Sequence, residues 1–192
     1  MKTTLRSSML TALFVGSAAI AGPRVADAGP QPDSHALGTK DTDNQELSDG
    51  QILGVVDTAN TSEIDQANVA ITKAEADSVK EFAQMMIKDH TAAKERDRAL
   101  AAGIGISVSA LSAGIQKESN ETMTLLMTVQ PSNFDRTYMQ TQVRAHQKVL
   151  RTLDELVPQA ASPQLKTLLT DMRATVERHL TTAEATLAAL GR

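Results

Sequence analysis

The chain has 192 residues, a net charge of −4, and neither cysteine nor tryptophan. One domain is the natural expectation at this length, and the absence of cysteine excludes disulfides and thiol chemistry. Acidic residues are in excess and basic clusters are missing, so no nucleic-acid or anionic-membrane partner is expected. Aromatic residues make up only 2% of the chain, so its core must be built mainly from Ala, Leu, Val, Ile and Met.

The N-terminus has the pattern of an export signal. Two basic residues precede an apolar run over residues 9–21, and Ala26-Asp-Ala28 fits a signal-peptidase site, with cleavage after Ala21 as the alternative. The run is too short for a comfortable membrane span, which takes about 20 residues. We therefore expect a signal peptide over residues 1–28 and a soluble protein in the periplasm or otherwise exported, with no membrane span after cleavage.

A polar leader and a first helix follow. Residues 29–47 are rich in Pro, Gly, Asp, Asn and Ser and predict a flexible segment. The helix should begin at Ser48 or Asp49, which are both good N-cap residues, and break near residues 74–77. Its apolar positions recur at spacings of three and four, as in a helix bundle, and Glu63 takes one of these inward positions.

The second helix and a long connection come next. Ser78 and Glu81 fit a capping box at the start of this helix, and Gly103 supplies a residue suited to its C-terminal cap. The connection from Gly103 to Pro131 is far longer than usual, and a weaker amphipathic pattern over residues 115–129 predicts a short accessory helix within it.

Two further long helices complete the pattern. The third begins after Asn133 and closes at Pro158, and the fourth opens with Ser162 as N-cap and Pro163 at its first position. Two tight turns and one long crossover between the second and third long helices are typical of a ferritin-like bundle. We therefore predict an all-α fold, a ferritin-like four-helix bundle over residues 48–190.

Four ionisable residues lie on the inward stripes of these helices: Glu63, His90, His146 and His179. The second and third helices should run parallel, and His90 and His146 stand 12 and 13 residues after their expected starts at Ser78 and Asn133. With a rise of about 1.5 Å per residue, all four side chains fall within roughly two helical turns of one another.

A buried carboxylate among buried imidazoles must find partners. Nitrogen and oxygen ligands at one level suggest a site for one divalent transition metal. The residues predicted to support these ligands are Asp89, Tyr138 and Glu177. The other interpretation is a structural polar layer that only sets the register of the helices. Both interpretations stay open from the sequence.

Other chemistry has little support in the sequence. No Glu-x-x-His occurs, because Ile87, Val143 and Val176 stand three residues before the histidines. A di-iron centre of the ferritin type is therefore not expected. No phosphate-binding glycine loop or nucleophile elbow is present either, so the sequence favours a non-enzymatic role without deciding the question.

Two motifs resemble a known family. They run over residues 82–90 (FAQMMIKDH) and 134–146 (FDRTYMQTQVRAH), and His179 follows later. They are similar to domain-of-unknown-function family 4142, whose members are often labelled putative outer membrane proteins, over roughly residues 48–190. The resemblance implies an exported ferritin-like bundle with no established activity.

Two functional hypotheses follow from the sequence. The first is a binding protein of the cell envelope that holds a divalent metal or a small ligand at the Glu/His cluster and serves in stress protection. The second is a non-catalytic structural or interaction module of the envelope. The identity of a metal, a protein partner and the oligomeric state lie beyond the sequence.

Overall fold

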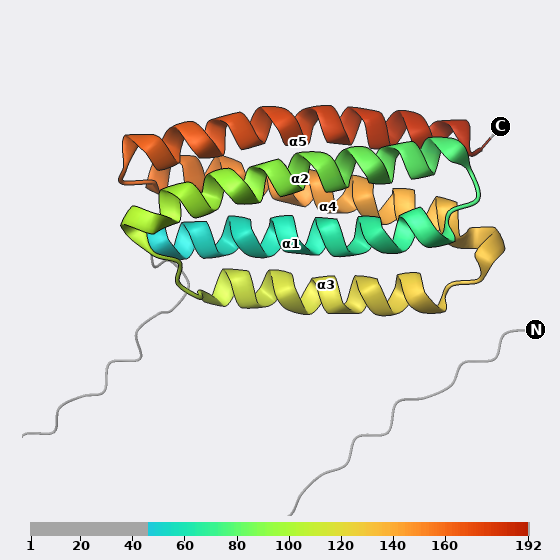
Figure 1. The fold of residues 1–192 in the computed structure, drawn as a ribbon, viewed down its shortest axis with the longest axis horizontal. Helices are drawn as coiled ribbons and strands as arrows, with labels where there is room; N and C mark the ends of the chain where they lie inside the picture. The colour runs from blue at the N-terminus through green and yellow to red at the C-terminus, as the bar shows by residue number, and fades with distance from the viewer. Residues whose placement is uncertain (1–45, 192) are drawn as a thin grey trace, which may run out of the picture. The chain divides into compact units, whose positions relative to one another are not determined.

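The computed structural model describes residues 46–191, which form five α-helices and no strands (Figure 1). The helices are α1 (Asp49–Lys73), α2 (Asp77–Ile104), α3 (Ala110–Thr128), α4 (Pro131–Gln159) and α5 (Pro163–Ala189). The predicted all-α class is confirmed for this range. The signal peptide and almost the whole predicted leader lie outside the described residues. Within them, no helix combines the length and apolar character that a membrane crossing requires.

Four long helices pack as two hairpins. α1 pairs with α2 and α4 pairs with α5, while α2 also contacts α5 and α1 also contacts α4. α3 lies outside this group and runs along α1, with fewer contacts to α4 (Figure 1). The predicted helical bundle is therefore present, with α3 as an additional outer helix.

The connecting helix α3 is longer than the sequence suggested. It spans 19 residues, whereas we predicted a short accessory helix over residues 115–129. Ser109 accounts for the difference, because its side chain accepts a hydrogen bond from the Ser112 amide and the Ser112 hydroxyl accepts one from the Ser109 amide. This reciprocal cap begins the helix at Ala110.

Two glycines let the segment before α3 lie against α1. Gly105 follows the end of α2 with a φ of 85°, a conformation that other residues rarely adopt. Gly54 faces the backbone of Ser107, and a Cβ atom there would lie only 2.1 Å from the Ser107 carbonyl oxygen. The Ser107 amide donates to the carbonyl of Gly50 at 2.9 Å, which fixes this close approach.

The turn between α1 and α2 is held by a side chain of α4. The carboxylate of Asp135 accepts hydrogen bonds from the amides of Glu75 (3.1 Å) and Ala76 (2.7 Å). Ala76 is the N-cap of α2 and makes no side-chain cap, so the capping box predicted for Ser78 and Glu81 is wrong. The amides that Asp135 binds belong to the turn just before α2, so a residue distant in sequence fixes the entry to this helix.

The turn between α4 and α5 is held in the same way from α1. The carboxylate of Asp49 accepts from the amides of Ala161 (2.8 Å) and Ser162 (2.9 Å). Desolvation acts to raise the pKa of Asp49, but these hydrogen bonds outweigh it and leave the pKa below its usual value. Ser162 caps α5 through Leu165, and Pro163 follows at the first helical position, both as predicted.

The boundaries of α4 differ slightly from the prediction. The helix begins at Pro131, two residues before Asn133, because proline fits the first helical position, where no amide donor is needed. It continues one residue beyond Pro158 to Gln159.

The core has two apolar parts. The aromatic core contains three aromatic rings together with Met and Ala side chains, and its residues are Ala67, Ala70, Ala74, Val79, Phe82, Ala83, Met86, Leu126, Phe134, Tyr138, Met139 and Ala183. The aliphatic core contains only aliphatic side chains and one methionine, and its residues are Ile52, Leu53, Val55, Val56, Leu153, Leu156, Ala160, Leu165, Leu169, Met172 and Val176. His146 on α4 and His179 on α5 occupy sequence positions between these two sets, and His90 follows Met86, the last residue of the aromatic core on α2.

Candidate metal centre

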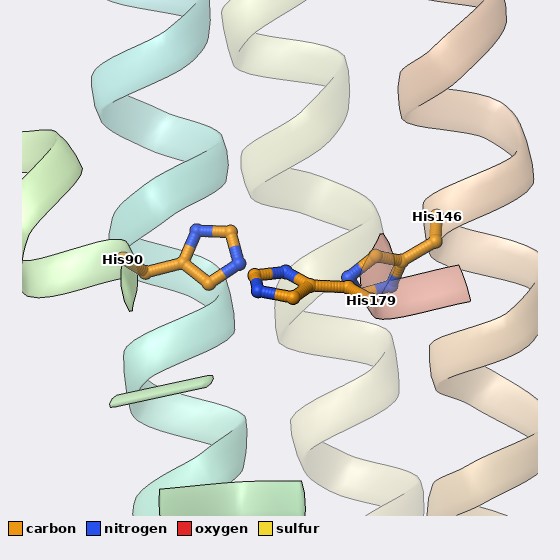
Figure 2. A group of neighbouring side chains, drawn as sticks. All are labelled: His90, His146 and His179. Carbon is orange, nitrogen blue, oxygen red and sulfur yellow. The ribbon is translucent and has the colours of Figure 1, made fainter. Parts of the chain in front are cut away.

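Three histidines from three helices meet inside the bundle. His90 of α2, His146 of α4 and His179 of α5 are 7%, 2% and 1% exposed. One ring nitrogen of each lies within 4.8 Å of one ring nitrogen of the other two. The ring centroids are 5.3 Å apart for His90 and His179 and 5.6 Å apart for His146 and His179. Figure 2 shows the three imidazoles converging between the helices.

Each imidazole is oriented by a hydrogen bond through one of its nitrogens. Nδ1 of His146 lies 2.8 Å from the carbonyl oxygen of Gln142, one turn earlier on α4. Nε2 of His179 lies 3.0 Å from the Asp89 carboxylate. A carbonyl and a carboxylate can only accept, so both ring nitrogens carry the proton and donate.

His90 is oriented through a short relay. Its Nδ1 lies 2.7 Å from Oδ1 of Asn60 on α1, and Nδ2 of Asn60 donates to the Asp97 carboxylate at 2.7 Å. Since the Asn60 amide nitrogen is committed to Asp97, its oxygen accepts from His90, whose Nδ1 therefore carries the proton. Asp97 therefore orients His90 indirectly, through the side chain of Asn60.

The second nitrogen of each ring is left without a partner. Among residues 46–191, Nε2 of His90, Nε2 of His146 and Nδ1 of His179 are buried and accept no hydrogen bond. In a neutral imidazole with one protonated nitrogen, the other carries a free lone pair. The cluster therefore presents three imidazole lone pairs, each on a ring held by an acceptor on its opposite side, which is the arrangement found around protein-bound metals.

The surroundings favour the neutral form of His90 and His179. Burial lowers the pKa of His90 well below its usual value, and the neighbouring His179 and His146 lower it further. Burial also lowers the pKa of His179, and the hydrogen bond that His179 donates to Asp89 only partly offsets this. Neutral imidazole is the form that binds metal ions, so little proton competition is expected at neutral pH.

The spacing of the nitrogens is somewhat wide for a bound ion. Three nitrogens at about 2.0–2.1 Å from one ion stand about 3.3–3.6 Å apart. The present separations reach up to 4.8 Å, so binding requires the rings to approach by an ångström or so. Small side-chain rotations can supply this, because the three rings come from different helices.

The other predicted site residues lie in several places. Glu63 of α1 is 7% exposed but does not belong to the group of mutually close nitrogens. Asp89 contacts His179 as described. Tyr138 is buried against Phe82, and burial together with Glu63 raises the pKa of its hydroxyl well above the usual value. Glu177 is exposed and pairs with Arg173 at 2.7 Å, so it does not support the histidines.

Two residues of this centre, Asn60 and Asp97, were not predicted from the sequence. A signal for both was present. Asp97 stands seven residues after His90 and therefore on the same helix face, and Asn60 stands three residues before Glu63 on the same inward stripe. A polar residue at such a position is a candidate partner for a buried histidine.

The chain matches a known protein family and is similar to solved structures. A family model described as "Domain of unknown function (DUF4142)" matches residues 34–186. No curated protein sequence matches the chain. Among solved structures, CopM in the Cu(II)-bound form is similar with a TM-score of 0.63 and 17% identity, covering 76% of this chain and 99% of that one. CopM in the Ag-bound form gives a TM-score of 0.57 and 17% identity, covering 72% and 94%. At this identity the similarity shows the fold.

Proposed function

This chain belongs to the DUF4142 family, and we propose that it is an exported helical-bundle protein that binds one transition-metal ion through His90, His146 and His179. The export and a role in the cell envelope are inferred from the N-terminal pattern of the sequence. The ferritin-like arrangement of the four long helices remains a prediction. The metal site itself is supported by the chemistry of the described side chains.

The observation that carries this proposal is the pairing pattern of the three rings. Each ring donates from one nitrogen to a fixed acceptor and keeps the other nitrogen buried without a partner in the described part of the chain. A polar layer that served only the register of the helices would leave three buried acceptors unsatisfied, at a cost of about 1–3 kcal/mol each. A bound metal ion removes that cost.

The donor set narrows the choice of metal. Imidazole nitrogen suits copper, zinc, iron and nickel, and three histidines with no thiolate are compatible with copper or zinc. We place copper first, because the structurally similar CopM is described in Cu(II)-bound and Ag-bound forms. Three protein ligands leave one coordination position for water or another small ligand.

The structural layer remains the competing interpretation, and one experiment separates the two. The full chain, purified without a histidine tag, is titrated with Cu(II) and with Zn(II), and bound metal is measured by elemental analysis. We expect one equivalent of metal and a rise in melting temperature. His146→Leu should keep the helical fold and weaken binding by at least about 100-fold, since losing a ligand exceeds the 10–100-fold cost of losing a residue that supports one.

The matched control is His35→Leu, which removes the histidine of the predicted leader. It should bind metal as the unaltered chain does. Binding of less than about a tenth of an equivalent of either metal, with no thermal shift, would contradict the proposal. So would metal binding that His146→Leu leaves unchanged. Greater stability of His146→Leu without any metal binding by the unaltered chain would favour the structural layer.

A further inference from the structure

A cavity separate from the histidine cluster lies between α3 and the bundle. It has a volume of about 110 Å³ and is bounded by α1, α3 and α4, with Met172 of α5 contributing to the wall. Its apolar lining includes Val55, Ile115, Val149 and Leu153. A cavity of about 150 Å³ with apolar walls holds a benzene molecule in another protein, so this smaller cavity, whose wall also contains polar residues, suits an apolar body no larger than a benzene ring.

One ionisable group in the cavity wall has no partner. Glu63 is one of the residues that line the cavity, and it is only 7% exposed. Its Oε2 is buried and receives no hydrogen bond from any residue between 46 and 191. A buried acceptor in a residue of the cavity wall calls for a donor that the described side chains do not provide.

A cationic side chain in the cavity wall already has a partner. Lys148 of α4 also lines the cavity, but its ammonium donates to both carboxylate oxygens of Glu118 on α3. This exposed ion pair joins α3 to α4 beside the cavity. Because Lys148 is held by Glu118, the negative charge of Glu63 is left for a cation from outside.

We propose that the cavity between α1, α3 and α4 is a binding site for a small organic ammonium compound, whose apolar body fills the space and whose ammonium group donates to Glu63. The apolar part of the wall favours an organic cation over a hydrated inorganic one, because only an organic body can fill that part of the space without losing a hydration shell. An anion is equally disfavoured, because the unpaired charge in the wall is negative. This site is independent of the metal centre, since Glu63 lies outside the histidine group.

The test uses benzylammonium as probe, with benzyl alcohol as its neutral counterpart and methylammonium as a cation without the apolar body. Binding to the full chain is measured by calorimetry and by NMR of the probe. We expect saturable binding of benzylammonium, at least about tenfold weaker binding of each comparison compound, and a similar loss in Glu63→Gln, since hydrogen bonds to charged groups are the stronger ones.

A second pair of variants tests the cavity itself. Ser119→Leu, on α3, places a larger side chain in the space, and Ser119→Ala removes the same hydroxyl without filling it. Ser119→Leu should abolish binding of benzylammonium while Ser119→Ala retains it, and metal content should be unaffected in both. If Ser119→Leu fails to fold, the isosteric Glu63→Gln still decides.

Two results would overturn the proposal. One is the absence of saturable benzylammonium binding, which would leave a cavity that holds only water. The other is binding that benzyl alcohol matches or that Glu63→Gln does not weaken, which would show that the carboxylate does not recognise the ligand.

Discussion

The aromatic core and the aliphatic core have different relations to the histidine cluster. In the aromatic core, Phe82 makes an edge contact with Tyr138 at a centroid distance of 6.2 Å and another with His146 at 6.5 Å. Phe134 stacks on Tyr138 at 6.2 Å. In the aliphatic core, residues such as Val55, Leu153 and Met172 also line the cavity.

This difference shows how a chain with so few aromatic residues uses them. Large flat rings have few rotatable bonds and form a rigid wall, and here they stand next to a proposed metal ligand. Aliphatic side chains fill the other part less completely and leave the space beside α3. We therefore expect changes in the aromatic core to affect both stability and metal binding, and changes in the aliphatic core to affect stability without affecting metal binding.

The largest expected effect comes from truncating one residue of each core. Phe82→Ala should lower the free energy of unfolding by about 3–5 kcal/mol, and Leu165→Ala by about 2–5 kcal/mol, because both side chains are almost fully buried. Only Phe82→Ala should also weaken metal binding, since only Phe82 contacts His146. Urea unfolding and metal titration of both variants measure this. Equal metal affinity in the two variants would remove the distinction between the cores.

A smaller effect is expected from Asp97, which supports His90 through Asn60. Burial raises the pKa of Asp97 to about 6 from its usual 3.8, despite the hydrogen bond from Asn60. A carboxyl whose pKa is raised by folding binds protons more tightly in the folded state. The contribution of Asp97 to the free energy of unfolding is therefore greatest below about pH 4 and is lost as the pH rises to about 6.

Asp97→Asn should consequently raise the free energy of unfolding by about 1–2 kcal/mol at pH 7.5 and remove this part of its pH dependence. The same change should weaken metal binding by about tenfold, because a neutral amide holds the relay to His90 less firmly. Glu95→Gln, an exposed neighbour on the same helix, is the matched control and should change neither quantity. A lower free energy of unfolding for Asp97→Asn at pH 7.5 would instead show that the buried carboxylate stabilises the fold.

The smallest effect concerns the two ends of the bundle. Asp135 holds the turn next to the aromatic core and Asp49 holds the turn next to the aliphatic core, each with two backbone amides. Asp135→Ala and Asp49→Ala should each cost about 1 kcal/mol, as for the loss of a helix cap. Hydrogen exchange should become faster at residues 75 and 76 in the first variant and at 161 and 162 in the second. Faster exchange at both turns in either variant would show that the ends are coupled.

The contribution of Asp49 should also depend on pH. Its pKa is lowered in the folded state, so the unfolded chain takes up a proton first as the pH falls. The stabilisation is therefore present above the usual pKa of about 3.8 and is lost as the pH falls through the lower folded value. Asp49→Ala should remove this acid sensitivity, which pH-dependent unfolding curves can detect.

Local signals in the sequence were sufficient to find the helices. Ser48 and Ser162 cap α1 and α5 as predicted, because a cap depends on residues within one turn of itself. The local pattern misled at the start of α2, where a distant residue orders the chain. The capping box predicted at Ser78 is absent, and the Asp135 carboxylate binds amides that precede the helix. The extent of α3 was underestimated because two serines form its cap and its apolar stripe is weak.

The sequence by itself determined which side chains point inward, since the helical period places His90, His146 and His179 on buried stripes wherever the helices pack. Only the tertiary structure decided which inward residues meet. It brought Asn60 and Asp97 to His90, and it placed Glu63 in the wall of the cavity beside α3. The physical reason is that the helical period sets direction around one axis, whereas contacts between helices depend on their spacing, their rotation and the side chains between them.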